Sequence, residues 1–378
     1  MDPNRRTVLK GLGVTGIAGL AGCSGGPTDS STPEPTEAEG GDGETDETDV
    51  PTATPEDETY IGMVYATGGL GDGSFNDQAQ QGLFAAEEDF GVQYQEVQPE
   101  SVSEFGPFQQ QFAQSSDPDY DLVCCIGFLQ ADALGSTAEN YPDQNFMIVD
   151  SVVDLPNVGN YVFAEHEGSF LVGQLAGMLT GMDFSAGAGS TAPDSSTVGF
   201  VGGVESDLIG RFEAGFISGV GHADDSVEVL TNYVGDFNDP AGGQEAALAM
   251  YNSGADIVYH AAGNTGTGVF QAAQEQGRFA IGVDRDQSVT RPDYADVILA
   301  SMVKRVDTAV YTSIESIANE NFEGGSVVSL GLEQEGVGIV YGDQLGADIP
   351  GDVTDAIASS REGIIAGDIS VPTDPSNA

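Results

Sequence analysis

The feature that most constrains the fold is a repeated alternation of short apolar runs with segments of helical periodicity, which begins at residue 60. The apolar runs have the length of strands, and the segments between them space their apolar residues as amphipathic helices do. We predict strands over residues 61–65, 92–97, 122–126, 146–149 and 161–163, and in a second series over residues 198–201, 227–233, 257–260, 279–283 and 297–301. This alternation is typical of βα units around a parallel sheet, and its return in a second series predicts an α/β chain with two similar lobes.

The rest of the chain completes these lobes. A long amphipathic segment at residues 167–179 leads into a stretch rich in Gly, Ser and Ala at residues 185–196, which we predict to be a surface loop. The remaining predicted segments are helices at 308–319 and 352–366, short strands at 327–330 and 338–341, and a frayed tail at 372–378.

The charge balance excludes whole classes of partner. The chain has 61 Asp and Glu against 10 Lys and Arg, with a formal net charge of −51. Nucleic acid and anionic lipid would repel such a chain. In very concentrated salt the Debye length falls to about 3 Å or less, which screens repulsion between surface carboxylates. We therefore interpret the acidity as adaptation of the surface to high salt.

The first residues have the pattern of an export signal. Arg5 and Arg6 precede an uncharged run at residues 11–22 that is shorter than the roughly 20 residues a membrane helix needs. The pair resembles a twin-arginine signal, although Val8 replaces the commoner Phe, and the LAGC sequence ending at Cys23 resembles a lipobox. We predict a signal peptide at 1–22, lipidation of Cys23, a disordered acidic tether at 23–58, and a protein anchored by lipid at the extracellular face of the cell membrane.

The sequence GGLGDGSFNDQAQQGL at residues 68–83 joins the first predicted strand to a helix. In open α/β sheets, ligands bind at this end of the strands. Asp72, Phe75, Asn76 and Asp77 are crowded at the tip of this loop, where they suit a ligand with a flat face and a polar edge. We interpret Asp77 as a charge at the helix N-terminus.

Polar residues also follow strands of the second series. The sequence AAGNTGTG follows the strand at 257–260 and DRDQS follows the strand at 279–283. The Gly-rich AAGNTGTG lacks the Lys-Ser/Thr of a P-loop and the spacing of a dinucleotide fingerprint. Asp284 and Asp286, with the acidic residues of the first loop, leave open a metal-dependent hydrolase. Lys304 is the only lysine after the signal peptide, and either an ion pair or a ligand contact would account for it. We predict buried free thiols at Cys124 and Cys125.

Several stretches together resemble the basic membrane protein (BMP) family of lipoproteins, the purine-nucleoside receptors of ABC importers. The motifs that carry the resemblance are the one at 68–83, EHEGSFLVGQLAGMLT at 165–180, RFEAGFISGV at 211–220, GADIVYHAAGNTGTGV at 254–269 and AIGVDRDQS at 280–288. The resemblance implies a type I periplasmic binding protein fold, with two doubly wound parallel-sheet lobes joined by a hinge. It also implies a nucleoside in the interlobe cleft and an ABC permease as partner.

The resemblance further implies roles for individual residues. Phe75 and Phe212 would enclose the base, and Asn76 and Asp150 would bind its edge. Asp284 and Lys304 would hold the ribose hydroxyls, with Lys304 orienting Asp284. Asp72 and Gly263 would line the cleft.

From these observations we predict a monomeric, non-enzymatic solute-binding protein without cofactor or metal. A sugar-binding or sensory lipoprotein and a nucleoside hydrolase are the alternatives. The predicted lobes comprise residues 59–163 with 303–325, and residues 164–302 with 326–368, followed by a tail at 369–378.

Overall fold

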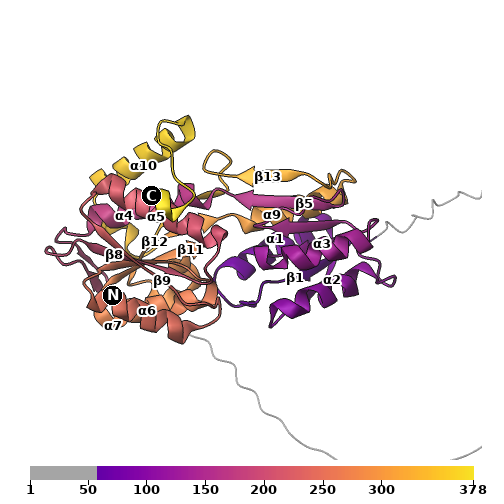
Figure 1. The fold of residues 1–378 in the computed structure, drawn as a ribbon, viewed down its shortest axis with the longest axis horizontal. Coiled ribbons are helices and arrows are strands. Elements are labelled where there is room, and N and C mark those ends of the chain that lie inside the picture. Colours follow the sequence, from indigo (N-terminus) through magenta and orange to yellow (C-terminus); the bar gives the residue numbers. More distant parts are fainter. Residues whose placement is uncertain (1–57) are drawn as a thin grey trace, which may run out of the picture. The chain divides into compact units, whose positions relative to one another are not determined.

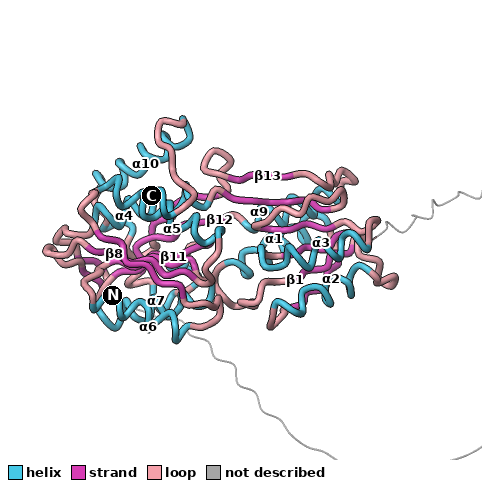
Figure 2. The backbone as a smooth tube through the Cα atoms, viewed as in Figure 1, coloured by secondary structure: helices cyan, strands magenta, loops and turns pink. Residues whose placement is uncertain are grey.

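The computed structural model describes residues 58–378. Within them the chain forms two six-stranded sheets, each with helices on both faces (Figures 1 and 2). This confirms the predicted α/β architecture of two parallel-sheet lobes. The predicted signal peptide, the lipidated Cys23 and all of the tether except Glu58 lie outside the described residues. No helix within the described part is long and apolar enough to cross a membrane.

The first sheet has the strand order β13-β5-β4-β3-β1-β2, and all neighbours are parallel. Its strands are β1 (Tyr60–Val64), β2 (Gln93–Val97), β3 (Leu122–Cys125), β4 (Phe146–Val149), β5 (Val158–Phe163) and β13 (Val327–Leu330). The helices of this lobe are α1 (Phe75–Phe90), α2 (Phe105–Ala113), α3 (Ala131–Asn140) and α9 (Val306–Ala318). α1 packs beside α9 on one face of the sheet, and α2 packs beside α3 on the other. Because both faces are covered, every residue of β3 and β4 is buried, including the free thiols of Cys124 and Cys125.

The second sheet has the order β14-β12-β11-β10-β8-β9, and only the β12–β14 pair is antiparallel. Its strands are β8 (Thr197–Gly202), β9 (Glu228–Tyr233), β10 (Ile257–Ala261), β11 (Phe279–Asp284), β12 (Ile298–Lys304) and β14 (Val337–Tyr341). The helices of this lobe are α4 (Glu165–Leu179), α5 (Asp207–Ala223), α6 (Pro240–Asn252), α7 (Gly266–Gln276), α8 (Gln287–Thr290) and α10 (Gly351–Ala366). α4 and α5 pack closely, since a Cβ on Gly219 would lie 2.0 Å from the carbonyl oxygen of Phe170. Only glycine permits this approach.

The chain passes between the lobes after β5, after β12, and between β13 and β14. Two boundaries therefore differ from the prediction. β13 pairs in parallel with β5, so this strand belongs to the first lobe although the sequence placed it in the second. β12 continues to Lys304, two residues beyond the predicted end of the second lobe's segment. A short run such as β13 has no feature that identifies its sheet, because pairing is decided by the neighbouring strand.

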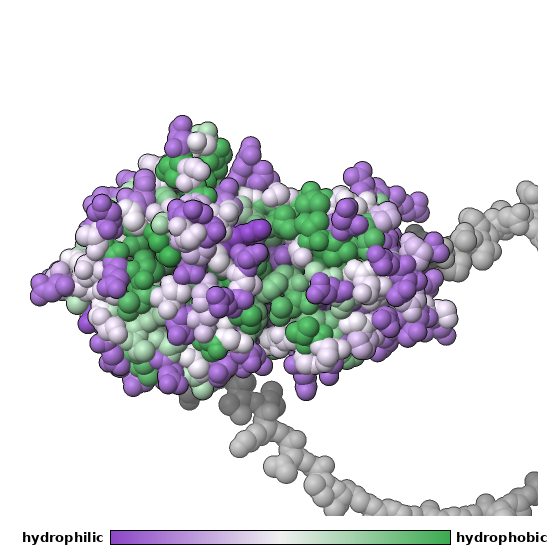
Figure 3. All heavy atoms as spheres, in the orientation of Figure 1, coloured by the Kyte–Doolittle hydropathy of each residue, from purple (hydrophilic) through white to green (hydrophobic). Residues whose placement is uncertain are grey.

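Two predicted irregular segments also differ from expectation. The stretch at 185–196 contains a hairpin of β6 (Ser185–Ala186) and β7 (Gly189–Ser190), and Thr191 beside it is buried. Asp256 holds this segment by accepting a hydrogen bond from the backbone N–H of Ala192. The predicted frayed tail ends in a 3₁₀ turn at Pro375–Asn377 that lies against α5. On the face shown in Figure 3, hydrophilic residues spread over both lobes with smaller hydrophobic patches between them.

Candidate ligand-binding cleft

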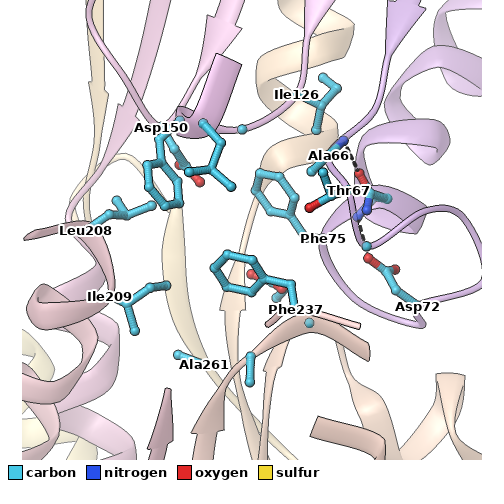
Figure 4. Close-up of a pocket in the computed structure, with 18 of the residues that line it drawn as sticks. Ala66, Thr67, Asp72, Phe75, Ile126, Asp150, Leu208, Ile209, Phe237 and Ala261 are labelled. Carbon is cyan, nitrogen blue, oxygen red and sulfur yellow. Dashed lines mark hydrogen bonds between the residues drawn. The ribbon is translucent and has the colours of Figure 1, made fainter. Parts of the chain in front are cut away.

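A cavity lies between the carboxyl ends of the two sheets, where both lobes contribute to its wall (Figure 4). The empty space between its lining atoms is about 670 Å³, a figure that includes the open mouth. All eight predicted ligand-binding residues line it: Asp72, Phe75, Asn76, Asp150, Phe212, Gly263, Asp284 and Lys304. The chain thus brings together side chains that are far apart in sequence, from Asp72 to Lys304.

The loop after β1 is organised by two of its own carboxylates. Asp72 accepts hydrogen bonds from the backbone N–H groups of Ser74 (2.9 Å), Asn76 (2.9 Å) and Asp77 (3.2 Å). Asp77 accepts from Gly71 at 2.7 Å and from Gly73 at 2.8 Å. Burial raises the pKa of Asp72, and the backbone N–H groups act against this by stabilising the charged form. Asp72 therefore lines the cavity but uses both carboxylate oxygens to shape the loop.

Asn76 is held in one orientation by the backbone. Its Oδ1 accepts from the N–H of Ala66 at 2.9 Å, and its Nδ2 donates to the carbonyl of Gly69 at 3.1 Å. An amide has two N–H donors and two acceptor lone pairs, so one of each remains for a ligand. The side chain can therefore present a donor and an acceptor together.

Aromatic rings from both lobes surround the ammonium of Lys304. Its Nζ lies 5.3 Å from the ring centroid of Phe75, 5.1 Å from that of Phe163 and 5.4 Å from that of Phe212. These distances allow cation–π attraction. Phe75 opens α1 in the first lobe, whereas Phe212 lies on α5 in the second.

The sequence prediction missed other apolar residues of the wall. Phe128 and Phe237 meet edge to face across the lobes, with ring centroids 6.4 Å apart. Leu208 and Ile209 also line the cavity. In Figure 4 they face the rings of Phe75 and Phe237, which point into the cavity. Phe128 and Phe237 each follow a predicted strand by a few residues, and this position at a strand's carboxyl end was the available signal.

Lys304 forms the centre of a buried ion-pair cluster. Its Nζ lies 2.6 Å from Oδ1 and 2.6 Å from Oδ2 of Asp150, and 3.2 Å from Oε1 of Glu165. Burial lowers the pKa of Lys304, but the carboxylates of Asp150, Glu165 and Asp284 together outweigh burial and raise it overall. Burial raises the pKa of Glu165 to about 7, although Lys304 opposes the shift. The expectation that Lys304 orients Asp284 is wrong, because its ion-pair partners are Asp150 and Glu165. Glu165 was not predicted as a site residue, although it opens the family-like motif at 165–180 and this position was the available signal.

Asp284 has a different environment at the end of β11. The hydroxyl of Ser74 donates to its Oδ2 across the lobes, and the residue has a left-handed backbone conformation with φ 66°. Burial raises the pKa of Asp284 to about 7, and the nearby ammonium of Lys304 opposes that shift. The carboxylate keeps acceptor capacity toward the cavity, so it suits a ligand that donates hydrogen bonds.

The sequence profile of the family described as "ABC transporter substrate-binding protein PnrA-like" matches residues 60–374. The chain belongs to this family. The resemblance found from the motifs is thereby confirmed, and the family is one of substrate-binding proteins of ABC transporters, not of enzymes.

Related proteins span most of the chain. The "ABC transporter nucleoside-binding protein BmpA" of Lactococcus lactis subsp. cremoris is 34% identical over 331 residues, which cover 82% of this chain and 88% of that protein. A protein described as a lipoprotein from Pyrococcus abyssi is 33% identical over 299 residues, covering 76% of this chain and 70% of its own. The crystal structure of an ABC transporter solute-binding protein from Aeropyrum pernix K1 is similar with a TM-score of 0.73 and 28% identity, covering 84% of this chain and 94% of that one.

Proposed function

We propose that this substrate-binding protein captures a nucleoside, preferably with a purine base, in the interlobe cleft and delivers it to an ABC permease. The observation that carries the proposal is the position of Phe75 and Phe212, which come from opposite lobes and line one cavity. A flat base can contact both rings, and stacking contributes about 1–3 kcal/mol per base. Closure of the lobes around the ligand is then a ligand-biased hinge motion.

The polar residues complete a site for a nucleoside. Asp284 accepts hydrogen bonds from the two vicinal ribose hydroxyls, and Lys304 contacts the ribose from its ion-pair cluster. Asn76 binds the edge of the base with its remaining donor and acceptor. Asp150 binds it with the carboxylate lone pairs that do not accept from Lys304. Asp72 and Gly263 line the cleft. The name of the Lactococcus relative, a nucleoside-binding protein, supports the same ligand class.

Calorimetric titration of the purified protein in concentrated salt tests this proposal. Inosine, guanosine and adenosine are expected to bind with micromolar or tighter affinity, more tightly than uridine and cytidine, while ribose and galactose give no heat. Micromolar affinity corresponds to about −8 kcal/mol, which ring contacts and a bound ribose can supply. Heat with a sugar and none with any nucleoside would refute the proposal in favour of the sugar-binding alternative.

The hydrolase alternative has less support from the geometry. Asp72 and Asp77 accept from backbone N–H groups, and Asp286 accepts from the N–H and hydroxyl of Ser288. Within residues 58–378, no group of three or more His, Cys, Asp or Glu side chains is arranged to hold a metal ion. The sensory alternative shares the fold and the site, and it is separated by the partner: a permease or a receptor kinase that captures the ligand-loaded protein.

We further propose that a lipid on Cys23 holds the protein at the extracellular face of the membrane. The twin-arginine pair and the LAGC sequence support this, as does the description of the Pyrococcus relative as a lipoprotein. Metabolic labelling with an alkyne fatty acid tests it. The unmodified protein should incorporate label and sediment with membranes, whereas Cys23→Ala should lose both; label retained in Cys23→Ala would contradict the assignment.

A further inference from the structure

In the loop at residues 68–74, here called the closure loop, three N–H groups point toward carboxylates of the first lobe. Two carbonyl groups of the loop point toward the second lobe. The N–H groups of Gly71, Gly73 and Ser74 bind Asp72 or Asp77 within the first lobe. Positive φ values of 82° at Gly71 and 58° at Gly73 allow this arrangement. The carbonyls of Gly71 and Gly73 consequently face the second lobe, where side chains donate to them.

Three side chains after β11 donate to these carbonyls. Thr290 Oγ1 donates to the Gly73 carbonyl at 2.8 Å, and Gln287 Nε2 donates to the same oxygen at 3.4 Å. Arg291 donates through NH2 to the Gly71 carbonyl at 2.9 Å and, within its own lobe, to Asn264 Oδ1 at 3.3 Å. A Cβ on Gly73 would lie 2.9 Å from Arg291 Nε, so the guanidinium is packed against the closure loop.

The orientation of Gln287 is set by the core of the second lobe. Its Oε1 accepts from the backbone N–H of Val283 at 2.8 Å and contacts Nε2 of His260 at 2.9 Å. Because the N–H of Val283 can only donate, the amide oxygen must face it, and Nε2 of His260 must carry the proton. The amide NH₂ of Gln287 is therefore left to face the Gly73 carbonyl in the other lobe. His260 is a positioning residue for this contact.

We propose that Gln287, Thr290 and Arg291 form a closure latch, which holds the two lobes together without a ligand and limits the rate at which a bound ligand leaves. The latch contacts join backbone carbonyls to donors from the opposite lobe, and none of them needs a molecule in the cavity. Because the acceptors are neutral carbonyls, the latch keeps its strength in concentrated salt, where ion pairs between exposed side chains are screened. Only its effect on ligand release depends on the proposed nucleoside function.

Distance measurement between spin labels tests the latch in the ligand-free protein. Labels on Asp132→Cys and Ala241→Cys report closure, because these exposed residues lie in the first turns of α3 and α6, which follow strand ends that face the cleft from opposite lobes. Cys23 is replaced by Ser, and the buried Cys124 and Cys125 are shielded from labelling. The labelled wild-type background should contain a population at the short, closed distance.

Arg291→Ala and Thr290→Val should each shift the distance distribution toward the open state, with the ratio of closed to open falling about tenfold for Arg291→Ala. Arg278→Ala is the matched control, since Arg278 donates to the carbonyl of Ser190 at 2.9 Å but makes this contact within the second lobe. The distance distribution of Arg278→Ala should equal that of the labelled wild-type background. An unchanged distribution in Arg291→Ala, or a background that is wholly open without ligand, would overturn the proposal.

Stopped-flow release of a bound purine nucleoside supplies the second readout. Arg291→Ala should release it about tenfold faster than the protein with Arg278→Ala. If no nucleoside binds at all while the distance shift is present, the latch stands and the proposed ligand class fails. If nucleosides bind but Arg291→Ala changes neither the distance distribution nor the release rate, the latch proposal is refuted and the proposed ligand class stands.

Discussion

Two buried aspartates on the cavity wall lie outside the ion pairs of Lys304, Asp72 in the first lobe and Asp284 in the second, and they differ in which groups donate hydrogen bonds to them. Asp72 of the first lobe accepts three backbone N–H groups from its own loop. Asp284 of the second lobe receives a single hydroxyl, that of Ser74, from the opposite lobe. Both are buried, and burial raises the pKa of both.

The difference separates a structural carboxylate from one suited to a ligand. A carboxylate that is saturated by its own backbone stabilises a loop and has little capacity left for a ligand. A carboxylate with one donor is incompletely solvated, and a ligand that supplies further donors lowers its free energy. The same residue type at two strand ends therefore has different expected roles, which substitution can distinguish.

The largest expected effect is a loss of stability when the ion-pair cluster around Lys304, which does not include Asp284, loses its lysine. Lys304→Met removes the buried cation that pairs with Asp150 and Glu165 and leaves only the partly exposed Arg211, 3.9 Å from Oε2 of Glu165. The free energy of unfolding should therefore fall by about 3–5 kcal/mol in urea titrations. Arg305→Met is the control, because Arg305 is half-exposed and lies 3.8 Å from Asp307; it should cost less than about 1 kcal/mol. Equal stability of the two variants would show that the cluster does not depend on its lysine.

The second prediction exchanges each aspartate for its amide. Asp284→Asn should weaken nucleoside binding by about 2–3 kcal/mol in calorimetry and leave the free energy of unfolding unchanged or higher, because a buried charge is removed. Asp72→Asn should lower the free energy of unfolding by about 2 kcal/mol, because an amide NH₂ replaces an acceptor of backbone N–H groups. Asp224→Asn is the control for stability, because Asp224 is exposed and its carboxylate also accepts a hydrogen bond from a backbone N–H, that of Ser226. The reverse pattern would overturn the distinction between the two residues.

The third prediction tests the aromatic wall beside the aspartates. Phe75→Ala should weaken nucleoside binding by about 1–3 kcal/mol through the loss of stacking. Phe84→Ala removes a ring from the same helix that is 42% exposed and does not line the cavity, so it should bind as the wild type does. A sugar has no base to stack on Phe75. Equal nucleoside affinity of the Phe75→Ala and Phe84→Ala variants would therefore contradict the proposal.

The smallest expected effect is a pH dependence near neutrality. Burial, assisted by the nearby carboxylates of Asp72 and Asp150, raises the pKa of Asp284 to about 7 in the folded protein from an ordinary value of 3.8, while the ammonium of Lys304 opposes the shift. A ligand that donates hydroxyls favours the ionised form, so affinity should fall by up to about tenfold per pH unit as pH falls below 7. Asp284→Asn should remove most of this slope; a slope that persists would assign the titration to another group, such as Glu165.

The unfolding free energy should change with pH in the opposite sense. Asp284 and Glu165 have folded pKa values of about 7 against ordinary values of 3.8 and 4.5. The folded protein therefore retains protons that the unfolded chain releases, and their contribution to stability should decline as pH rises from about 4 to about 7. Urea titrations across this range check the sign, and Asp284→Asn should show a smaller decline than the wild type.

The local pattern was sufficient to predict most elements of the fold. β4 has the predicted bounds, and β1, β3 and β11 differ from theirs by a residue or so. Buried parallel strands are short and apolar on both faces, so they contrast clearly with the helices between them. The hairpin at 185–196 was missed because Gly, Ser and Ala have weak strand preferences, and its order comes from contacts with Asp256 and other residues far along the chain.

The eight cavity residues could be predicted because strand ends and family-like motifs mark positions, and positions at the same edge of a sheet meet in space. Partners could not be predicted in the same way. Lys304 was singled out as the one lysine of the globular part, but its pairing with Asp150 and Glu165 depends on where the chain crosses between the lobes.

The sequence by itself determined the two-lobed α/β architecture, the acidic surface and the strand-end position of the loop at residues 68–83. Apolar periodicity and composition are local properties, and they are sufficient for these features. Only the tertiary structure decided that Asp72 is saturated by its own loop, that Asp284 meets Ser74 across the cleft, and that Arg291 reaches the Gly71 carbonyl. Hydrogen bonds and ion pairs act over a few ångströms, so their partners are chosen by the packing of distant segments and not by the order of residues along the chain.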